Sequence, residues 1–173
     1  MAFFPMFFDL EGKNILVVGA GIVGSRRIDV LIQMGALVTV VASSASESVI
    51  RWSKEGKIQL ILSDYRKYRE TQILQKVEKK NSCEPLFMIL AVTGDLEVDE
   101  LAAADGRNLH AFVNVAGDRA QSDFYFPGIA RTGIITAGII ADGINHKLAK
   151  QATEQVGAFL HEKFHDIDGS GQK

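Results

Sequence analysis

Three glycines with the spacing G-x-G-x-x-G, Gly19, Gly21 and Gly24, form the pattern in this 173-residue chain that most directly predicts chemistry. An apolar run, Ile15 to Val18, precedes them and an amphipathic segment follows. In a strand that turns into a helix, Gly19 would supply unusual backbone angles, Gly21 would admit a pyrophosphate, and Gly24 would let the helix pack closely. The free N–H groups at the helix start would face the phosphate charge. The pattern predicts a dinucleotide site; the alternative is a tight turn without a ligand.

The glycine turn needs a strand before it and a helix after it, and the chain repeats this alternation. After a first helix that Gly35 is expected to end, apolar runs predict strands at residues 36–42, 58–62, 85–92 and 111–115. Helices are predicted between them, at about 44–55, at 68–80 and from 95 to just before 108. This order predicts an α/β fold, a Rossmann-like doubly wound parallel sheet with its ligand at the carboxyl ends of the strands.

Two signals mark helix starts in this part of the chain. Ser44 and Glu47 have the spacing of a capping box, which predicts that Ser44 caps the second helix. Asp95 precedes an acidic first turn and is predicted to cap the helix after the fourth strand. Glu47 is the acid closest in sequence to the end of the second strand. Its role as the capping partner of Ser44 explains its presence there without a contact to a cofactor.

The alternation ends after Val115. Residues 122–127 and 131–136 predict a short antiparallel hairpin separate from the sheet, and a helix follows with inward positions Ile144, Leu148, Ala152, Val156 and Leu160. We therefore expect a dinucleotide-binding Rossmann domain at 1–115, an extension for dimerisation and substrate at 116–165, and a disordered tail at 166–173. The extension is smaller than independent domains usually are, so pairing with a second copy in a homodimer is expected.

Composition and charge exclude several classes of partner. The net charge of −2 gives no field that would attract nucleic acid or an anionic membrane surface. The single cysteine, Cys83, excludes an intrachain disulfide and a multi-cysteine zinc site. No apolar run is long enough to span a membrane, and residues 1–10 lack the basic start and cleavage site of a signal peptide. We expect a cytoplasmic protein whose N-terminal aromatic side chains pack over strand edges.

Five ordered segments together carry a family resemblance. They are Pro5 to Lys13, Gly19 to Arg27, Gly35 to Ala42, Ala91 to Asp95, and Asn114 to Pro127. In this set the chain resembles the precorrin-2 dehydrogenase family, which includes the N-terminal part of siroheme synthase. The resemblance implies NAD-dependent oxidation of the tetrapyrrole precorrin-2 to sirohydrochlorin by a dimer with interlocked second domains. Some members of the family also insert iron into the product.

The resemblance places cofactor contacts on Ile22 and Val23 in the glycine turn and on Ser43 and Ser44 after the second strand. Thr93 and Gly94 would lie beside the cofactor at the end of the fourth strand. No acid ends the second strand, although an NAD site usually places Asp or Glu there. The preference for NAD over NADP therefore rests on the resemblance, with Ser43 as a candidate ribose partner. The expected cofactor-binding set is Gly19, Gly21, Ile22, Val23, Gly24, Ser43, Ser44, Thr93 and Gly94, with no metal site.

The catalytic residue is less well matched. Family members carry an Asp after Asn-Val; the same register here gives Gly117, with Asp118 one residue later. A carboxylate there could accept the proton that leaves precorrin-2 as its hydride is removed. Asp118 is the candidate base, and an exposed Asp in a turn is the alternative. The loop at 140–146 also departs from the family pattern. A family member without activity, which carries the tetrapyrrole or binds NAD, is thus the second hypothesis; an NAD-sensing regulatory module is the third.

For several basic side chains the sequence allows two roles. Arg26, Arg27, Arg119 and Arg131 could contact substrate carboxylates or be solvated surface charges, and the last two are the better candidates because they lie in the extension. His146, at a predicted helix start, could transfer protons or be a surface residue. His161 and His165 have metal-ligand spacing, but no third ligand is near in sequence, which favours a solvated helix end.

Overall fold

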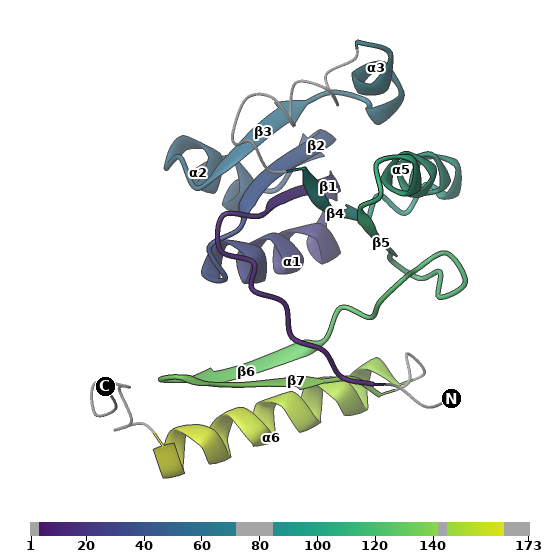
Figure 1. Cartoon of the computed structure of the whole chain (residues 1–173). Helices are drawn as coiled ribbons and strands as arrows, with labels where there is room; N and C mark the ends of the chain where they lie inside the picture. Colours follow the sequence, from purple (N-terminus) through teal and green to yellow (C-terminus); the bar gives the residue numbers. More distant parts are fainter. Residues whose placement is uncertain (1–3, 72–84, 142–144, 165–173) are drawn as a thin grey trace. The chain divides into compact units, whose positions relative to one another are not determined.

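The computed structural model describes residues 4–71, 85–141 and 145–164 (Figure 1). The chain forms two compact units: a sheet unit, Phe8–Phe124, and a hairpin unit, Met1–Phe7 with Tyr125–Lys173. Several predictions fall outside the described residues. These are the position of Cys83, the helix beyond residue 71, the centre of the loop at 142–144, His165, and the tail at 166–173.

The sheet unit is built on five parallel strands, as the alternation predicted. The strands are β1 Asn14–Ala20, β2 Leu37–Ala45, β3 Ile58–Leu62, β4 Leu86–Ala91 and β5 Phe112–Val115, in the order β3-β2-β1-β4-β5. All seven residues of β1 are buried, which is typical of a central strand covered on both faces. The order reverses between β1 and β4, and such a switch point is where parallel α/β sheets bind ligands.

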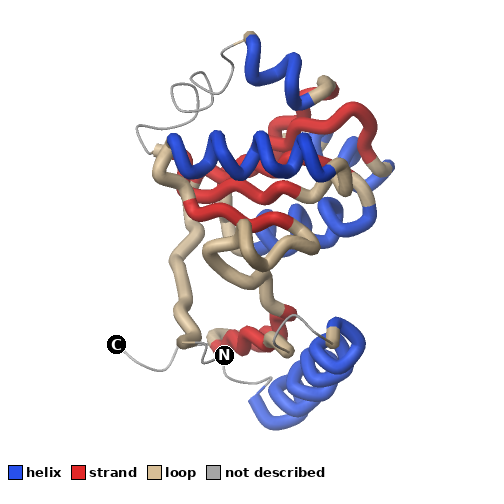
Figure 2. The backbone as a smooth tube through the Cα atoms, turned by 90° about the vertical axis from the view of Figure 1, so that its right-hand side faces the viewer, coloured by secondary structure: helices blue, strands red, loops and turns tan. Residues whose placement is uncertain are grey.

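Helices cover both faces of this sheet (Figures 1 and 2). They are α1 Ile22–Gln33, α2 Glu47–Lys54, α3 Tyr65–Glu70 and α5 Leu96–Asn108. Among them, α1 contacts α2, and α3 contacts α5. Two helix boundaries follow the predicted signals. Gly35 has a φ of +73° just after α1, and Asp95 caps α5 by accepting hydrogen bonds from the N–H groups of Glu97 and Val98.

The predicted capping box at Ser44 is wrong. Strand β2 continues to Ala45, which pairs with Ala20 after a shift of register in β1. The cap of α2 is Ser46, whose hydroxyl accepts a hydrogen bond from the N–H of Val49. Strand pairing thus outweighed the local capping signal. As a result Ser44 stays on the strand, and Glu47 begins α2 rather than partnering Ser44.

Phe8 and two strand residues form an aromatic cluster in the sheet unit. The ring of Phe8 packs against Phe87 and Phe112, with ring centroids 5.6 and 5.2 Å away. Both partners lie near the amino ends of β4 and β5, opposite the expected ligand edge. The prediction that N-terminal aromatic side chains pack over strand edges is therefore confirmed for Phe8 but not for Phe4 and Phe7, which are 85% and 72% exposed.

The hairpin unit contains the predicted antiparallel hairpin and helix. Its elements are β6 Gly128–Thr132, β7 Ile135–Ile139 and α6 His146–Phe164, and α6 packs on both strands. Leu160 is buried, as expected, but Leu148 is 53% exposed, so its predicted inward position is wrong within the single chain.

The first unit extends past the predicted domain boundary at 115. Ser122 accepts a hydrogen bond from the N–H of Val115, and Asp123 accepts one from the N–H of Val113. These bonds hold the loop after β5 against the strand, and the unit ends at Phe124. In the part of the chain that the structure describes, no helix is both long and apolar enough to cross a membrane.

Candidate functional site

Two of the three glycines in the turn are required by packing alone. Gly19 has a φ of +109°, and a Cβ there would lie 2.7 Å from the carbonyl oxygen of Val92 at the end of β4. A Cβ on Gly24 would lie 2.5 Å from the carbonyl oxygen of Gly19. Because both contacts are with backbone, side chains could not be accommodated by small shifts. These two glycines fit a tight turn whether or not a ligand binds.

Gly21 is different, because nothing in the fold requires it to be glycine. Its φ is −76°, which any residue adopts, and a Cβ would meet no atom within 4 Å. Gly21 is the N-cap of α1 and offers no side-chain cap, so the first amides of the helix keep no side-chain acceptor. Ile22 and Val23 in this first turn are 75% and 48% exposed. The open space and uncapped amides fit the pyrophosphate of a dinucleotide.

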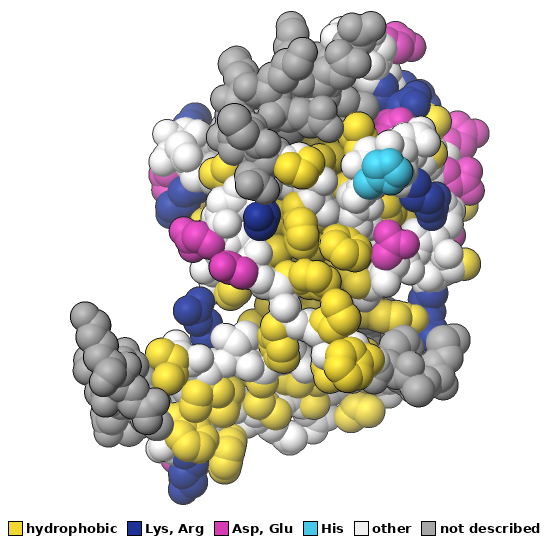
Figure 3. Space-filling model, in the orientation of Figure 1, with side chains coloured by type: hydrophobic (Ala, Val, Ile, Leu, Met, Phe, Trp, Pro, Cys, Tyr) yellow, Lys and Arg dark blue, Asp and Glu magenta, His cyan; other side chains and the backbone are white. Residues whose placement is uncertain are grey.

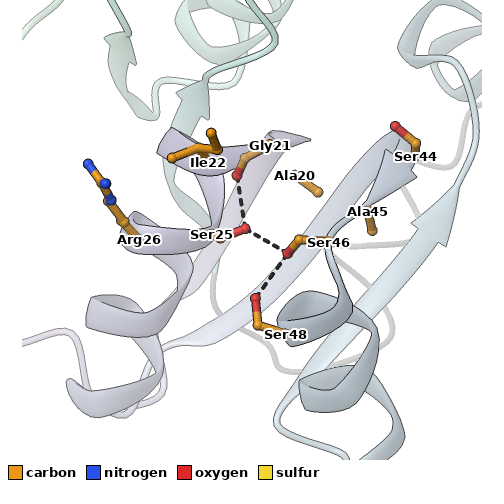
Figure 4. Close-up of a pocket in the computed structure, with 9 residues that line it drawn as sticks. All are labelled: Ala20, Gly21, Ile22, Ser25, Arg26, Ser44, Ala45, Ser46 and Ser48. Atoms are coloured by element: carbon orange, nitrogen blue, oxygen red, sulfur yellow. Dashed lines mark hydrogen bonds between the residues drawn. The ribbon is translucent and has the colours of Figure 1, made fainter.

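A cavity of about 520 Å³ adjoins this turn (Figure 4). It is lined by Ala20, Gly21, Ile22, Ser25, Arg26, Ser44, Ala45, Ser46 and Ser48. The expected residues Gly21, Ile22 and Ser44 are thus brought together, whereas Ser43 does not line the cavity. The sequence analysis missed Ser25, Ser46 and Ser48. The four serines within residues 43–48 were a signal that could have identified the last two.

Three of these serines form a hydrogen-bonded row between α1 and α2 (Figure 4). The Ser25 hydroxyl donates to the carbonyl oxygen of Gly21 at 2.8 Å. Its oxygen lies 2.8 Å from that of Ser46, which lies 3.0 Å from that of Ser48. Since the Ser25 proton is used, Ser46 donates to Ser25 and Ser48 donates to Ser46. The row fixes the start of α2 beside the turn and leaves the Ser48 oxygen as an acceptor.

The residues that line the cavity include one cation, Arg26, and no carboxylate. None of its nine lining residues is Asp or Glu. Glu47 follows at the start of α2 but is exposed and does not line the cavity. Arg26 on α1 is exposed and makes no ion pair with any side chain in the described ranges.

The end of β4 lies directly beside the glycine turn and is held by a buried carboxylate. Asp99 of α5 is 2% exposed. Its Oδ1 accepts hydrogen bonds from the hydroxyl and N–H of Thr93, at 2.7 and 3.0 Å, and its Oδ2 accepts one from the N–H of Gly94. The Thr93 hydroxyl is therefore committed to the fold, and any cofactor contact here would come from its backbone or from Gly94. Sequence reasoning read Asp99 only as part of an acidic first turn.

A hydrogen bond from Arg27 to Asn114 links α1 to β5. Nη1 of Arg27 donates to Oδ1 of Asn114 at 2.6 Å, and Nδ2 of Asn114 donates to the carbonyl oxygen of Phe124 at 2.6 Å. Burial lowers the pKa of Arg27 to about 10, and the charge of Asp99 opposes this shift. Arg27 therefore stays protonated at neutral pH and has a structural role, unlike the two roles that the sequence suggested.

Asp118 lies in the loop after β5, and its carboxylate is already hydrogen-bonded. Its Oδ1 accepts from the N–H groups of Ala120 and Gln121, and its Oδ2 accepts from the Gln121 side-chain amide at 3.1 Å. The hydrogen bonds from Gln121 lower the pKa of this partly exposed group below its usual value. Gly117, the position of the family Asp, has a φ of +88°, where most side chains would be strained. Asp118 is thus oriented, ionised and partly exposed to solvent.

The histidines form no metal site in the described structure. The side chain of His146 is not described, and His161 is exposed on α6. Among the described residues, no three His, Cys, Asp or Glu side chains come close enough to hold a metal ion.

Comparisons with known proteins agree with the expected family. A family model described as "Putative NAD(P)-binding" matches residues 6–128. A siroheme biosynthesis protein of Ruminiclostridium josui, HemA, is 31% identical over 88% of the chain, and siroheme synthase 1 of Yersinia enterocolitica is 30% identical over 96%. The chain spans only 27% and 33% of the length of these two relatives.

The fold also matches a solved structure. The structure of SirC, a precorrin-2 dehydrogenase, superposes with a TM-score of 0.69 and 24% sequence identity. The match covers 94% of this chain and 74% of the other. The Rossmann-like architecture predicted from the glycine turn and the strand order is confirmed.

Proposed function

Because the chain belongs to the NAD(P)-binding family of the siroheme synthases and precorrin-2 dehydrogenases, we propose that it oxidises precorrin-2 to sirohydrochlorin with NAD. The observation that carries the proposal is the position of Gly21. There the fold leaves open space in front of uncapped helix amides, although packing does not demand a glycine. A turn without a ligand would need Gly19 and Gly24 but not Gly21.

The residues at the carboxyl edge of the sheet have distinct roles in this proposal. The amides of Ile22 and Val23 hold the pyrophosphate, and Ser44 contacts the adenosine ribose. Asp99 fixes the loop at Thr93 and Gly94 beside the cofactor. NAD, when bound, accepts the hydride from the macrocycle. The accompanying proton must go to a base of the protein or to water.

Asp118 is our proposed proton acceptor. Its lowered pKa keeps the carboxylate ionised at neutral pH, and the Gln121 contacts hold it in one orientation. The same contacts reduce its basicity, so its contribution should fall near the low end of what general bases supply. The alternative role of this side chain is to cap its own loop.

We also propose that residues 116–165 serve dimerisation and substrate binding in a cytoplasmic homodimer. Leu148 and Phe159 lie about three turns apart on α6, hence on one side of the helix, and each is 53% exposed. Figure 3 shows hydrophobic side chains gathered on the hairpin unit. A two-stranded hairpin with one helix buries little by itself, and a second copy would cover this apolar stripe.

Sedimentation tests the dimer. Wild-type protein should sediment as a dimer at micromolar concentration, and a variant with Leu148→Glu and Phe159→Glu should sediment as a monomer. Lys150→Glu, on the same helix and 79% exposed, is the control and should remain dimeric. A monomeric wild type would remove this part of the proposal.

A second candidate function is a family member that carries the tetrapyrrole without oxidising it. The observation that favours it is Gly117, whose backbone suits glycine rather than the family Asp. The deciding experiment mixes the purified chain with precorrin-2 and NAD and follows absorbance. We expect sirohydrochlorin and NADH to appear together in equal amounts. Binding of NAD without turnover would favour the carrier, and failure to bind NAD would contradict the dehydrogenase.

A further inference from the structure

We infer that the cavity beside β2 accepts the 2′-phosphate of NADP, so that the chain binds NADP as well as NAD. The inference rests on the proposed dinucleotide site and adds a subsite to it. It concerns the group that distinguishes the two cofactors, the substituent on the 2′ oxygen of the adenosine ribose. In a Rossmann fold this ribose lies at the end of the second strand.

The first observation is the charge of the lining. NAD-selective sites place a carboxylate at the end of β2, which accepts a hydrogen bond from the 2′-hydroxyl and repels a 2′-phosphate. Here β2 ends with Ser43, Ser44 and Ala45, of which the last two line the cavity, and no lining residue is acidic. Glu47 is nearby in sequence, but the extension of β2 to Ala45 puts it at the start of α2, outside the lining. No acidic residue of the lining opposes a 2′-phosphate.

The second observation is the supply of hydrogen-bonding groups. Ser44 is exposed at the end of β2 and makes no hydrogen bond to any described residue, so its hydroxyl can donate to a phosphate oxygen. Ser48 can also donate if its proton turns from Ser46 toward the ligand. These are neutral donors on two sides of one cavity, which suits a tetrahedral group with several acceptor oxygens.

The third observation is Arg26. It is the cation among the lining residues, it is exposed, and no described carboxylate pairs with it. Figure 4 shows its side chain extending from α1 away from the serines, so the guanidinium must turn toward the cavity to meet a phosphate. A long exposed side chain without a partner can do so, and Arg is suited to paired hydrogen bonds with phosphate.

Titration calorimetry of the full chain with NAD and with NADP tests the inference directly. We expect NADP to bind at least as tightly as NAD, and its affinity to fall more steeply as salt is added. NADP binding more than about tenfold weaker than NAD would overturn the subsite while leaving the proposed function intact. If neither cofactor binds, the proposed function fails together with the inference.

Two substitutions assign the subsite to its residues. Arg26→Gln should weaken NADP about tenfold, the effect of losing one charged hydrogen bond, and leave NAD within about twofold. Ser44→Asp should weaken NADP by more than about tenfold and leave NAD binding equal or tighter. Arg51→Gln is the control, since Arg51 is a neighbouring exposed cation of α2 that does not line the cavity. It should change neither affinity.

The pattern of losses distinguishes the outcomes. If Arg26→Gln weakens NAD and NADP equally, Arg26 binds the shared pyrophosphate and its assignment to the 2′-phosphate is wrong. If Ser44→Asp leaves NADP unchanged, the ribose lies elsewhere and the subsite is overturned. 2′,5′-ADP and 5′-ADP lack the nicotinamide half of the cofactor and can each compete with NADP for the site. Competition by 2′,5′-ADP that is at least as strong as that by 5′-ADP supports the subsite. Weaker competition contradicts it.

Discussion

The glycine turn and the loop after β5 both lie at the carboxyl edge of the sheet, but they differ in whether their polar groups have hydrogen-bond partners within the chain. The turn leaves the first amides of α1 without a side-chain cap and leaves space in front of Gly21. The loop after β5 satisfies its groups internally: Asp118 accepts from three donors, and Ser122 bonds to β5. Unsatisfied donors beside open space indicate a ligand site, whereas a closed set of bonds indicates a loop that positions one side chain.

The largest effect is expected where the turn is held by packing. Gly19→Val should destabilise the protein by about 3 kcal/mol or more, because its backbone is strained for any side chain and its Cβ would collide with Val92. Gly12→Ala is the matched control, since Gly12 has a φ of +67° but open space, and should cost about 1 kcal/mol. Chemical denaturation measures both. Equal stability of the two variants would mean that β4 does not crowd the turn.

In the loop after β5, Asp118→Asn keeps the size and most hydrogen bonds of the side chain but removes its basicity. Turnover of precorrin-2 should fall about 10²-fold, the low end for general-base catalysis, with NAD affinity unchanged. Steady-state kinetics and an NAD titration provide the two readouts. Near-normal turnover would assign Asp118 to loop capping alone.

A smaller effect sharpens the role of Gln121. Its hydrogen bonds hold the pKa of Asp118 below the usual value, so the base stays charged to lower pH. In Gln121→Ala the pKa should rise toward its ordinary value, and the acidic limb of the pH–rate profile should move to higher pH. If the acidic limb of the pH–rate profile does not move, a group other than Asp118 determines the loss of activity at low pH.

The smallest effect concerns the start of α2. Ser46→Ala should cost about 1 kcal/mol because it removes the helix cap and interrupts the row between Ser25 and Ser48. Ser44→Ala should leave stability unchanged, since Ser44 caps nothing. Thermal unfolding compares the two. A larger loss of stability in Ser44→Ala than in Ser46→Ala would show that Ser44 caps α2 after all.

Strands with runs of apolar residues were predictable from the sequence, and β1, at the centre of the sheet, is buried along its whole length. Strand β3 has the predicted bounds, and Asp95 caps α5 as its position suggested. The second helix start was misplaced because a local capping signal at Ser44 competed with strand pairing of Ala45, which no local pattern reveals.

In the candidate site, too, some features were predictable from the local sequence and others depend on contacts in the fold. The glycine spacing located the turn, but it could not separate Gly21 from its neighbours, because that difference depends on what surrounds each Cβ. Asp99 was interpreted only as part of an acidic helix start, although its partners Thr93 and Gly94 lie six and five residues before it. Arg27 was not recognised because its partner, Asn114 of β5, lies 87 residues away in the sequence. Long-range contacts of this kind require the folded chain.

The most direct test of the dinucleotide site is the affinity of Gly21→Val for NAD, measured by calorimetry on the full chain. The fold should tolerate this side chain, since its Cβ would meet no atom within 4 Å, so the unfolding temperature should stay close to that of the wild type. The added side chain would occupy the approach to the helix amides, and NAD affinity should fall roughly tenfold or more. Unchanged NAD affinity in a folded Gly21→Val protein would contradict the assignment of the glycine turn to the cofactor.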